Sequence, residues 1–411
     1  MRGHVRRAVG WSIALSALLV WIPLAAPAGA ATNKPLAPKP TSTGVSPTAP
    51  DPNPPAGGTS PDGTVPGGSR LASRGTVVPT GAPPLPKQIG ARAWLLADLD
   101  TGDILAARDA HGRYQPASTL KLLTALAVLP HLPGSRVVTV SPQAAGTEGS
   151  AVGLLAGGRY TVDELFDALL LVSANDAATA LAEANGGVAA TVAQMNSMAV
   201  TLGAYDTYVQ TPSGLDGWQQ LTSAYDMALV LQQAVRQPRL VAYDRLPEAG
   251  YPPRASKYGR VGRYAFANQN TDFLTTVPGA LLAKSGYTDA ARHTYLAAAR
   301  RNGHTLGVVL LRNSRLPLDQ YRQAGALLDW GFKLPSGTTP VGRLAGPLLT
   351  NPPQPRSSLG SALAMASGSQ PDYGGWTILI PITAAVAGGL WLGCVALGGR
   401  RMLLRQGSRQ P

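Results

Sequence analysis

The sequence predicts an α+β domain in which an antiparallel β-sheet is built from both ends of one central segment and is packed with helices, beside an all-helical lobe. Strand patterns open this segment at Ala91–Leu99 and close it between Leu281 and Leu311, whereas helical apolar spacing fills the interval from Ser118 to about Arg236. Because strands lie at both ends and helices lie between them, a binding site is expected in the cleft between sheet and helices.

The individual elements follow from local patterns. Ala91–Leu99 and Asp103–Arg108 flank the turn Asp100-Thr101-Gly102 and predict a hairpin. Helical spacing occurs in Thr119–Leu129, Val162–Val172, Ala177–Ala184, Val188–Leu202 and Ser223–Val235. The closing strands are predicted at Leu281–Tyr287, His293–Arg300 and Thr305–Leu311, and a last helix at Leu316–Phe332.

The charge of the chain lies mostly in its ends. The 411 residues carry a net charge of +13, but residues 88–335 hold 21 Lys and Arg against 19 Asp and Glu. A nearly neutral folded part does not indicate a nucleic-acid partner. The single cysteine, Cys394, excludes an intramolecular disulfide and a Cys-rich metal site, and the histidines lack ligand spacing. No metal and no cofactor are predicted.

Both ends of the chain carry membrane signals. Three arginines precede an apolar stretch and the small residues Ala28–Ala31, which predicts a secretory signal peptide over residues 1–31, with an uncleaved anchor as the alternative. The 22 uncharged residues Trp376–Leu397 would span about 33 Å as a helix, enough for a single pass, so a transmembrane helix is predicted over residues 376–398. Four arginines follow in residues 399–411, which predicts a cytoplasmic tail and an exported central segment.

Two segments between these ends have the composition of linkers. Residues 32–87 contain 14 Pro and 8 Gly in 56 positions, and residues 336–375 are also rich in Pro, Gly and Ser. Such segments bury too little apolar surface to offset the entropy lost on ordering. The sequence therefore predicts one folded domain over residues 88–335, held off the membrane by the second linker.

The first candidate catalytic motif is Pro116-Ala117-Ser118-Thr119-Leu120-Lys121. Helical spacing places Ser118 and Lys121 on one face, with Ser118 at the helix start, where the dipole favours a developing oxyanion. A serine needs an adjacent base, and a lysine can be that base when burial or a second cation lowers its pKa. The alternative is a capping serine beside a surface lysine.

Two further motifs follow on predicted element ends. Ser173-Ala174-Asn175 lies on a short connection between helices, where a hydroxyl can relay a proton and an amide can bind an amide, although an ordinary N-cap is the alternative. The run Lys284-Ser285-Gly286-Tyr287-Thr288 ends a predicted strand, whose edge can receive an extended peptide. Gly286 would allow close approach, and the alternative is a polar strand end entering a turn.

The three motifs occur in order, 55 and then 111 residues apart. In this combination the chain resembles the penicillin-recognising serine acyltransferases, and among them the low-molecular-mass penicillin-binding proteins, the D-alanyl-D-alanine carboxypeptidases. Supporting stretches are Thr211–Asp216 (TPSGLD), Thr222–Ala228 (TSAYDMA) and Pro278–Thr288 (PGALLAKSGYT). The resemblance covers about residues 88–335 and implies a β-lactamase/transpeptidase-like fold.

The resemblance also implies the chemistry. A serine-type carboxypeptidase of the bacterial cell membrane would remove the terminal D-alanine from peptidoglycan stem peptides ending in D-Ala-D-Ala, and β-lactams would acylate it. Ser118 would form the acyl-enzyme, Lys121 would take its proton, and Ser173 would pass a proton to the leaving D-alanine. The residues expected to bind substrate are Asn175, Lys284, Ser285, Gly286, Tyr287 and Thr288. The backbone N–H groups of Ser118 and Tyr287 would form the oxyanion hole.

Other functions of the same fold stay open from the sequence. A β-lactamase would need a positioned deacylating base, often a glutamate, and Glu183 and Glu248 are the only glutamates between Asn175 and Lys284. A D,D-endopeptidase, a transpeptidase and a non-catalytic wall-binding protein are the remaining alternatives. Two positions depart from the family pattern: Ser285 stands where Thr is commoner, and Thr211 replaces the usual Asn.

Overall fold

The structure is a computed structural model that describes residues 58–251, 254–256, 259–261 and 264–346. Its contacts divide the chain into two units, Met1–Pro353 and Gln354–Pro411, and every described residue belongs to the first. The predicted signal peptide (1–31), transmembrane helix (376–398) and basic tail (399–411) lie outside the described residues. Within the described ranges, no helix has both the length and the apolar character needed to cross a bilayer.

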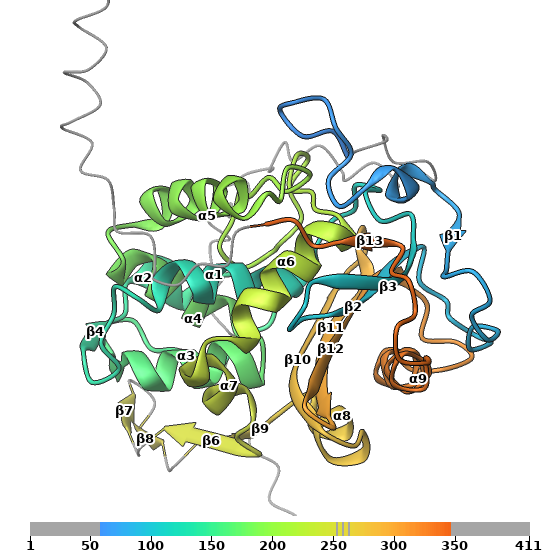
Figure 1. Cartoon of the computed structure of the whole chain (residues 1–411). Helices are drawn as coiled ribbons and strands as arrows, with labels where there is room; N and C mark the ends of the chain where they lie inside the picture. Colours follow the sequence, from blue (N-terminus) through green and yellow to red (C-terminus); the bar gives the residue numbers. More distant parts are fainter. Residues whose placement is uncertain (1–57, 252–253, 257–258, 262–263, 347–411) are drawn as a thin grey trace, which may run out of the picture. The chain divides into compact units, whose positions relative to one another are not determined.

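The centre of the molecule is a seven-stranded antiparallel sheet (Figure 1). Its strand order is β1-β3-β2-β12-β11-β10, and β13 pairs with β3 beside β1. The strands are β1 (Thr76–Val77), β2 (Ala93–Asp98), β3 (Asp103–Arg108), β10 (Ala280–Thr288), β11 (Arg292–Arg301), β12 (His304–Asn313) and β13 (Gly342–Arg343). Leu95 of β2 lies opposite Val309 of β12, so the opening hairpin joins the closing strands, and the α+β prediction is confirmed.

Both faces of the sheet are covered, because side chains alternate along each strand. Leu95 and Ala97 of β2 pack toward the helical lobe, whereas Trp94 and Leu96 pack toward the other layer. Helix α6 (Ala224–Val235) lies on the first face, and α9 (Gln320–Phe332) and α8 (Thr271–Thr276) lie on the second (Figure 1). Helix α9 begins at Gln320, later than the predicted Leu316, because Asp319 is extended and is the N-cap of the helix.

The helical lobe follows the predicted apolar spacing. It contains η2 (Ala117–Leu120), α1 (Lys121–Val128), α2 (Pro142–Ala145), α3 (Val162–Leu171), α4 (Asn175–Ala184), α5 (Val188–Leu202) and α7 (Pro238–Asp244). Thr161 and Glu164 form a capping box that starts α3, and Gly203 ends α5 in the left-handed conformation at φ 79°. Three strand pairs lie outside the main sheet: β4 (Val137–Thr139) with β5 (Arg159–Thr161), β6 (Glu248–Tyr251) with β9 (Tyr264–Ala267), and β7 (Arg254–Ser256) with β8 (Gly259–Val261).

The folded part is wider than the predicted 88–335. Residues 58–87, predicted as linker, contain η1 (Ser69–Ala72), whose Leu71 is buried, and β1, which pairs with β3. After residue 335, Val341 and Leu344 are buried around β13, which pairs with β3 at the same sheet edge as β1. The prediction was wrong for these segments because β3 leaves ladder groups open at the sheet edge, and composition alone does not show which residues will pair with them.

Candidate active site

The first motif lies where η2 passes into α1. Ser118 belongs to η2, Lys121 is the first residue of α1, and the Lys121 Nζ lies 2.9 Å from the Ser118 Oγ. The chain enters this turn at Ala117 with φ 47°, and the Thr119 hydroxyl donates to the carbonyl of Pro116 (2.6 Å). The spacing therefore brings the hydroxyl and the amine into direct contact.

Lys121 is fully buried, which excludes the alternative of a surface lysine. Its Nζ also lies 2.7 Å from the Asn175 Oδ1 and donates to the carbonyl of Ser213. Burial lowers the pKa of Lys121 well below its usual value, and the positive charge of Lys284 lowers it further, against an opposing effect of Asp176. A neutral amine beside a hydroxyl is the arrangement that a general base requires.

The second motif connects α3 to α4. Ser173 has φ 61°, an uncommon conformation for a residue other than glycine, and among the described residues its buried Oγ has no hydrogen-bond partner. The N-cap of α4 is Ala174, without a side-chain cap. The alternative in which Ser173 or Asn175 caps this helix is therefore wrong. The Asn175 Nδ2 instead donates to the carbonyl of Glu148 (2.7 Å), so its amide oxygen faces Lys121.

The third motif lies on β10, an edge strand of the sheet. Lys284 is fully buried, and its Nζ donates to the carbonyl of Ser285 (2.9 Å). Burial lowers the pKa of Lys284 to about 8, while Asp244 acts in the opposite direction. Tyr287 is 51% exposed, and the Thr288 hydroxyl donates to the Asp216 carboxylate (2.6 Å).

Gly286 allows β10 to approach the nucleophile. A Cβ at this position would lie 2.8 Å from the backbone N of Ser118, 3.1 Å from the Cβ of Ala117 and 2.5 Å from the Oγ1 of Thr294. Thr294 on β11 in turn donates to the carbonyl of Pro116 (2.9 Å), which fixes the serine turn against the sheet. The close approach therefore involves the serine turn itself, whereas the sequence suggested it only for a ligand.

The loop around Thr211–Asp216 completes the wall around Lys121. Gly214, at φ 82°, lies so close to Ala117 that a Cβ there would overlap the Ala117 carbonyl oxygen. Thr124 of α1 donates to the carbonyl of Pro212 (2.6 Å). In the sequence, this stretch indicated only a resemblance to the family. No residue type in it indicated that a backbone carbonyl would face Lys121.

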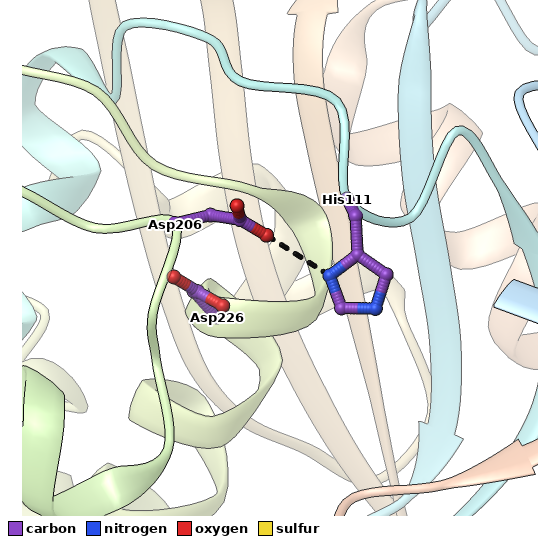
Figure 2. Close-up of side chains that lie close together, drawn as sticks. All are labelled: His111, Asp206 and Asp226. Atoms are coloured by element: carbon purple, nitrogen blue, oxygen red, sulfur yellow. Dashed lines mark hydrogen bonds and ion pairs between the residues drawn. The ribbon is translucent and has the colours of Figure 1, made fainter. Parts of the chain in front are cut away.

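A second polar cluster, of His111, Asp206 and Asp226, lies outside these motifs (Figure 2). Each side chain places one possible metal-ligating atom within 4.8 Å of the others. However, the His111 Nδ1 lies 2.9 Å from the Asp206 Oδ2 and the Nε2 lies 3.0 Å from the carbonyl oxygen of Pro66. Because both ring nitrogens face oxygen acceptors, both donate, and neither has a lone pair for a metal.

Comparisons with known proteins agree with this geometry. The family model described as D-alanyl-D-alanine carboxypeptidase matches residues 79–314. DacB2 of Mycobacterium tuberculosis, a D-alanyl-D-alanine carboxypeptidase, is 38% identical over 262 residues, which are 63% of this chain and 87% of DacB2. DacF of Bacillus subtilis, which bears the same enzyme name, is 27% identical over 59% of this chain and 62% of its own length.

Solved structures show the same relationship. A crystal structure of a D-alanyl-D-alanine carboxypeptidase from Mycobacterium tuberculosis H37Rv superposes with a TM-score of 0.60 at 38% identity, over 65% of this chain and 99% of that one. A Streptomyces DD-transpeptidase at 24% identity shares the fold, with a TM-score of 0.56 over 61% of this chain and all of that one. This chain belongs to the D-alanyl-D-alanine carboxypeptidase family of serine peptidases.

Proposed function

We propose that this chain cleaves the terminal D-alanine from peptidoglycan stem peptides ending in D-Ala-D-Ala, through an acyl-enzyme on Ser118. The observation that carries the proposal is the contact of 2.9 Å between the Ser118 Oγ and a fully buried Lys121 Nζ. Burial and the neighbouring charge of Lys284 both favour the neutral amine, which is the form that accepts a proton.

In the proposed acylation step, the Ser118 Oγ attacks the carbonyl carbon between the two D-alanines and its proton passes to the Lys121 Nζ. The backbone N–H groups of Ser118 and Tyr287 stabilise the oxyanion. The C–N bond then breaks, and the leaving amine of D-alanine receives a proton from Lys121 through the Ser173 hydroxyl. The unpaired Ser173 Oγ supports this relay, because no partner among the described residues occupies it.

The second half of the cycle uses the same groups. Water attacks the ester, gives its proton to Lys121, and the Ser118 hydroxyl is restored as the shortened peptide leaves. Asn175 is proposed to orient the peptide amide, and Lys284 with Ser285 to attract the terminal carboxylate, while Gly286 keeps the strand close to the nucleophile. The Thr288 hydroxyl donates to Asp216 and would have to exchange this partner to bind the carboxylate.

Mutation of the nucleophile tests this proposal. We expect Ser118→Ala to abolish both release of D-alanine from a D-Ala-D-Ala peptide and covalent labelling by a fluorescent penicillin, because no other group supplies the attacking oxygen. The matched control is Thr119→Ser, which keeps a hydroxyl beside the nucleophile. A wild-type protein that shows neither reaction would contradict the proposal.

The lifetime of the penicillin adduct separates carboxypeptidase from β-lactamase. Glu183 accepts a hydrogen bond from Ser141 (2.8 Å), and Glu248 lies exposed on β6, so neither supports a deacylating role at Ser118. We therefore expect mass spectrometry of the intact protein to show a long-lived adduct. Rapid loss of the adduct would favour a β-lactamase, and transfer of the acyl group to an amine would favour a transpeptidase.

We further propose that the catalytic domain is exported and tethered to the bacterial membrane. The support is the predicted signal over residues 1–31, the apolar segment 376–398 and the basic residues 399–411. Deletion of residues 376–411 is expected to release the active domain from the membrane fraction of expressing cells. Continued membrane association of the truncated protein would contradict this assignment of the anchor.

A further inference from the structure

The edge of β10 is covered just before the third motif begins. The Asp244 Oδ2 at the end of α7 accepts a hydrogen bond from the backbone N–H of Ala283 (2.8 Å), and the Asn270 Nδ2 donates to the Ala283 carbonyl (3.0 Å). Backbone groups of alternate residues point to the same side of a strand, so Ser285 and Tyr287 present theirs to the same edge as Ala283. The covered part of the edge therefore ends where the proposed substrate register begins.

Asp244 is fully buried and is fixed in place through its backbone as well. The Asn268 Nδ2 donates to the backbone carbonyl of Asp244 (2.6 Å). Among the described residues, the Asp244 Oδ1 has no hydrogen-bond partner. Burial raises the pKa of Asp244 to about 7, and the hydrogen bond from Ala283 and the charge of Lys284 lower it. Besides Lys284, the charge of Asp244 acts on Tyr295 of β11. The pKa of Tyr295 is raised well above its usual value, mainly by burial and then by this charge.

We propose that Asp244 is a positioning residue of the peptidase, which fixes the β10 edge through the Ala283 peptide and keeps Lys284 protonated through its charge. The effect reaches the base, because the positive charge of Lys284 lowers the pKa of Lys121. Without the carboxylate, Lys284 loses its proton at lower pH, and the site then loses both its attraction for the substrate carboxylate and the charge that keeps Lys121 neutral. This inference rests on the function proposed above.

The test compares two side chains that bind the backbone of the same residue, Ala283. Asp244→Asn keeps an oxygen for the Ala283 N–H and removes the charge, whereas Asn270→Ser removes the other hydrogen bond without a charge change. The rate constant for acylation of full-length protein by a fluorescent penicillin is measured from pH 5.5 to 9.5. We expect Asp244→Asn to move the alkaline limb down by about one pH unit, with about a fivefold loss at pH 8 and about a tenfold loss at pH 9.5, and Asn270→Ser to leave the limb in place.

An unmoved limb in Asp244→Asn, or an equal shift in Asn270→Ser, would overturn the inference. If the variant does not fold, carbon-13 NMR of the Asp244 carboxyl keeps it testable, because charge coupling is reciprocal. In Lys284→Gln the pKa of Asp244 should rise relative to the wild type, and an unchanged value would refute the coupling. A wild-type protein that penicillin does not acylate would count against the proposed function, whereas acylation with no shift would count against Asp244 alone.

Discussion

Two buried polar clusters among the described residues, one around Ser118 and one around His111, differ in the charges that they bring together. Around Ser118, burial lowers the pKa of both Lys121 and Lys284, and the positive charge of Lys284 lowers that of Lys121 further. Around His111, opposite charges meet: burial opposes the charged forms, but the mutual hydrogen bond raises the pKa of His111 and lowers that of Asp206.

The hydrogen bonds differ in the same way. Asp206 accepts from His111 (2.9 Å), from Arg113 (3.0 Å) and from the backbone of Gly58 (2.9 Å). In the active site, by contrast, the Ser173 Oγ is unpaired among the described residues. The comparison teaches that burial of titratable groups does not by itself indicate catalysis. Like charges and an unpaired hydroxyl indicate a site prepared for reaction, whereas opposite charges with paired atoms indicate a structural contact.

Replacement of Lys121, the proposed base, should have the largest effect on this contrast. In Lys121→Met we expect the acylation rate to fall by about 10³-fold, because general-base assistance is lost. Stopped-flow labelling with a fluorescent penicillin measures the rate, and Lys87→Met, at an exposed lysine, is the control. A rate within tenfold of wild type would show that Lys121 is not the base.

Replacement of His111 should lower stability and leave activity unchanged. His111→Ala leaves Asp206 without one partner and removes the ring contact with Tyr225, so we expect a loss of about 2–4 kcal/mol in the free energy of unfolding. Because the pKa of His111 is raised in the folded state, its contribution is full below about pH 6.5 and declines as the pH rises through the folded value.

Urea unfolding at pH 6 and at pH 8.5 measures this difference. Activity per folded molecule should not change, because His111 lies outside the three motifs. His304→Ala, at an exposed histidine near Asp98, is the matched control and should change stability by no more than about 0.5 kcal/mol. An equal loss of unfolding free energy in both variants would show that the buried His111 cluster stabilises the fold no more than an exposed histidine does.

The approach of β10 to the nucleophile gives the next prediction. A Cβ in Gly286→Ala would meet the Ser118 backbone N at 2.8 Å and obstruct the proposed oxyanion hole. We expect the acylation rate to fall by about 10–100-fold, which is less than the loss of a whole oxyanion donor at its upper limit. Gly303→Ala, where a Cβ meets open space in a turn, controls for glycine loss, although its φ of 82° adds some strain. Equal activity of Gly286→Ala and wild type would contradict this role.

The smallest effect is expected at Asp226. Burial and the charge of Asp206 raise the pKa of Asp226 to about 7, above the usual value for a carboxyl group. Its ionisation therefore opposes folding increasingly as the pH rises from about 4 to 7. Asp226→Asn should be more stable than wild type at pH 8, with the gain vanishing near pH 4. A gain that does not depend on pH would show that ionisation is not its cause.

The sequence predicted most of the strands and helices that frame the site, because their apolar periodicity is local. The hairpin at Asp100-Thr101-Gly102 and the helix Val188–Leu202 are found where the pattern placed them. By contrast, β1, β13 and the outer strand pairs were missed, since short strands gain their stability from partners that are distant in the sequence.

The candidate site could be predicted only as three motifs. Their order identified Ser118, Lys121, Ser173 and Lys284, and the structure brings Ser118 and Lys121 into contact. The Ser213 carbonyl and Asp244 were not predicted, because a backbone acceptor has no side-chain signature and a lone aspartate at a helix end resembles any surface acid.

The sequence by itself determined the family and the chemical types of the groups in the three motifs. Its pattern of apolar residues also predicted that these motifs lie at the ends of helices and strands. Tertiary structure decided their protonation. Lys121 is an ordinary lysine in an isolated helix, and its proposed role as a base depends on the loop at Ser213 and the strand carrying Lys284, which enclose it. Burial and charge proximity act through space between residues that are far apart in the chain, so only the folded arrangement determines them.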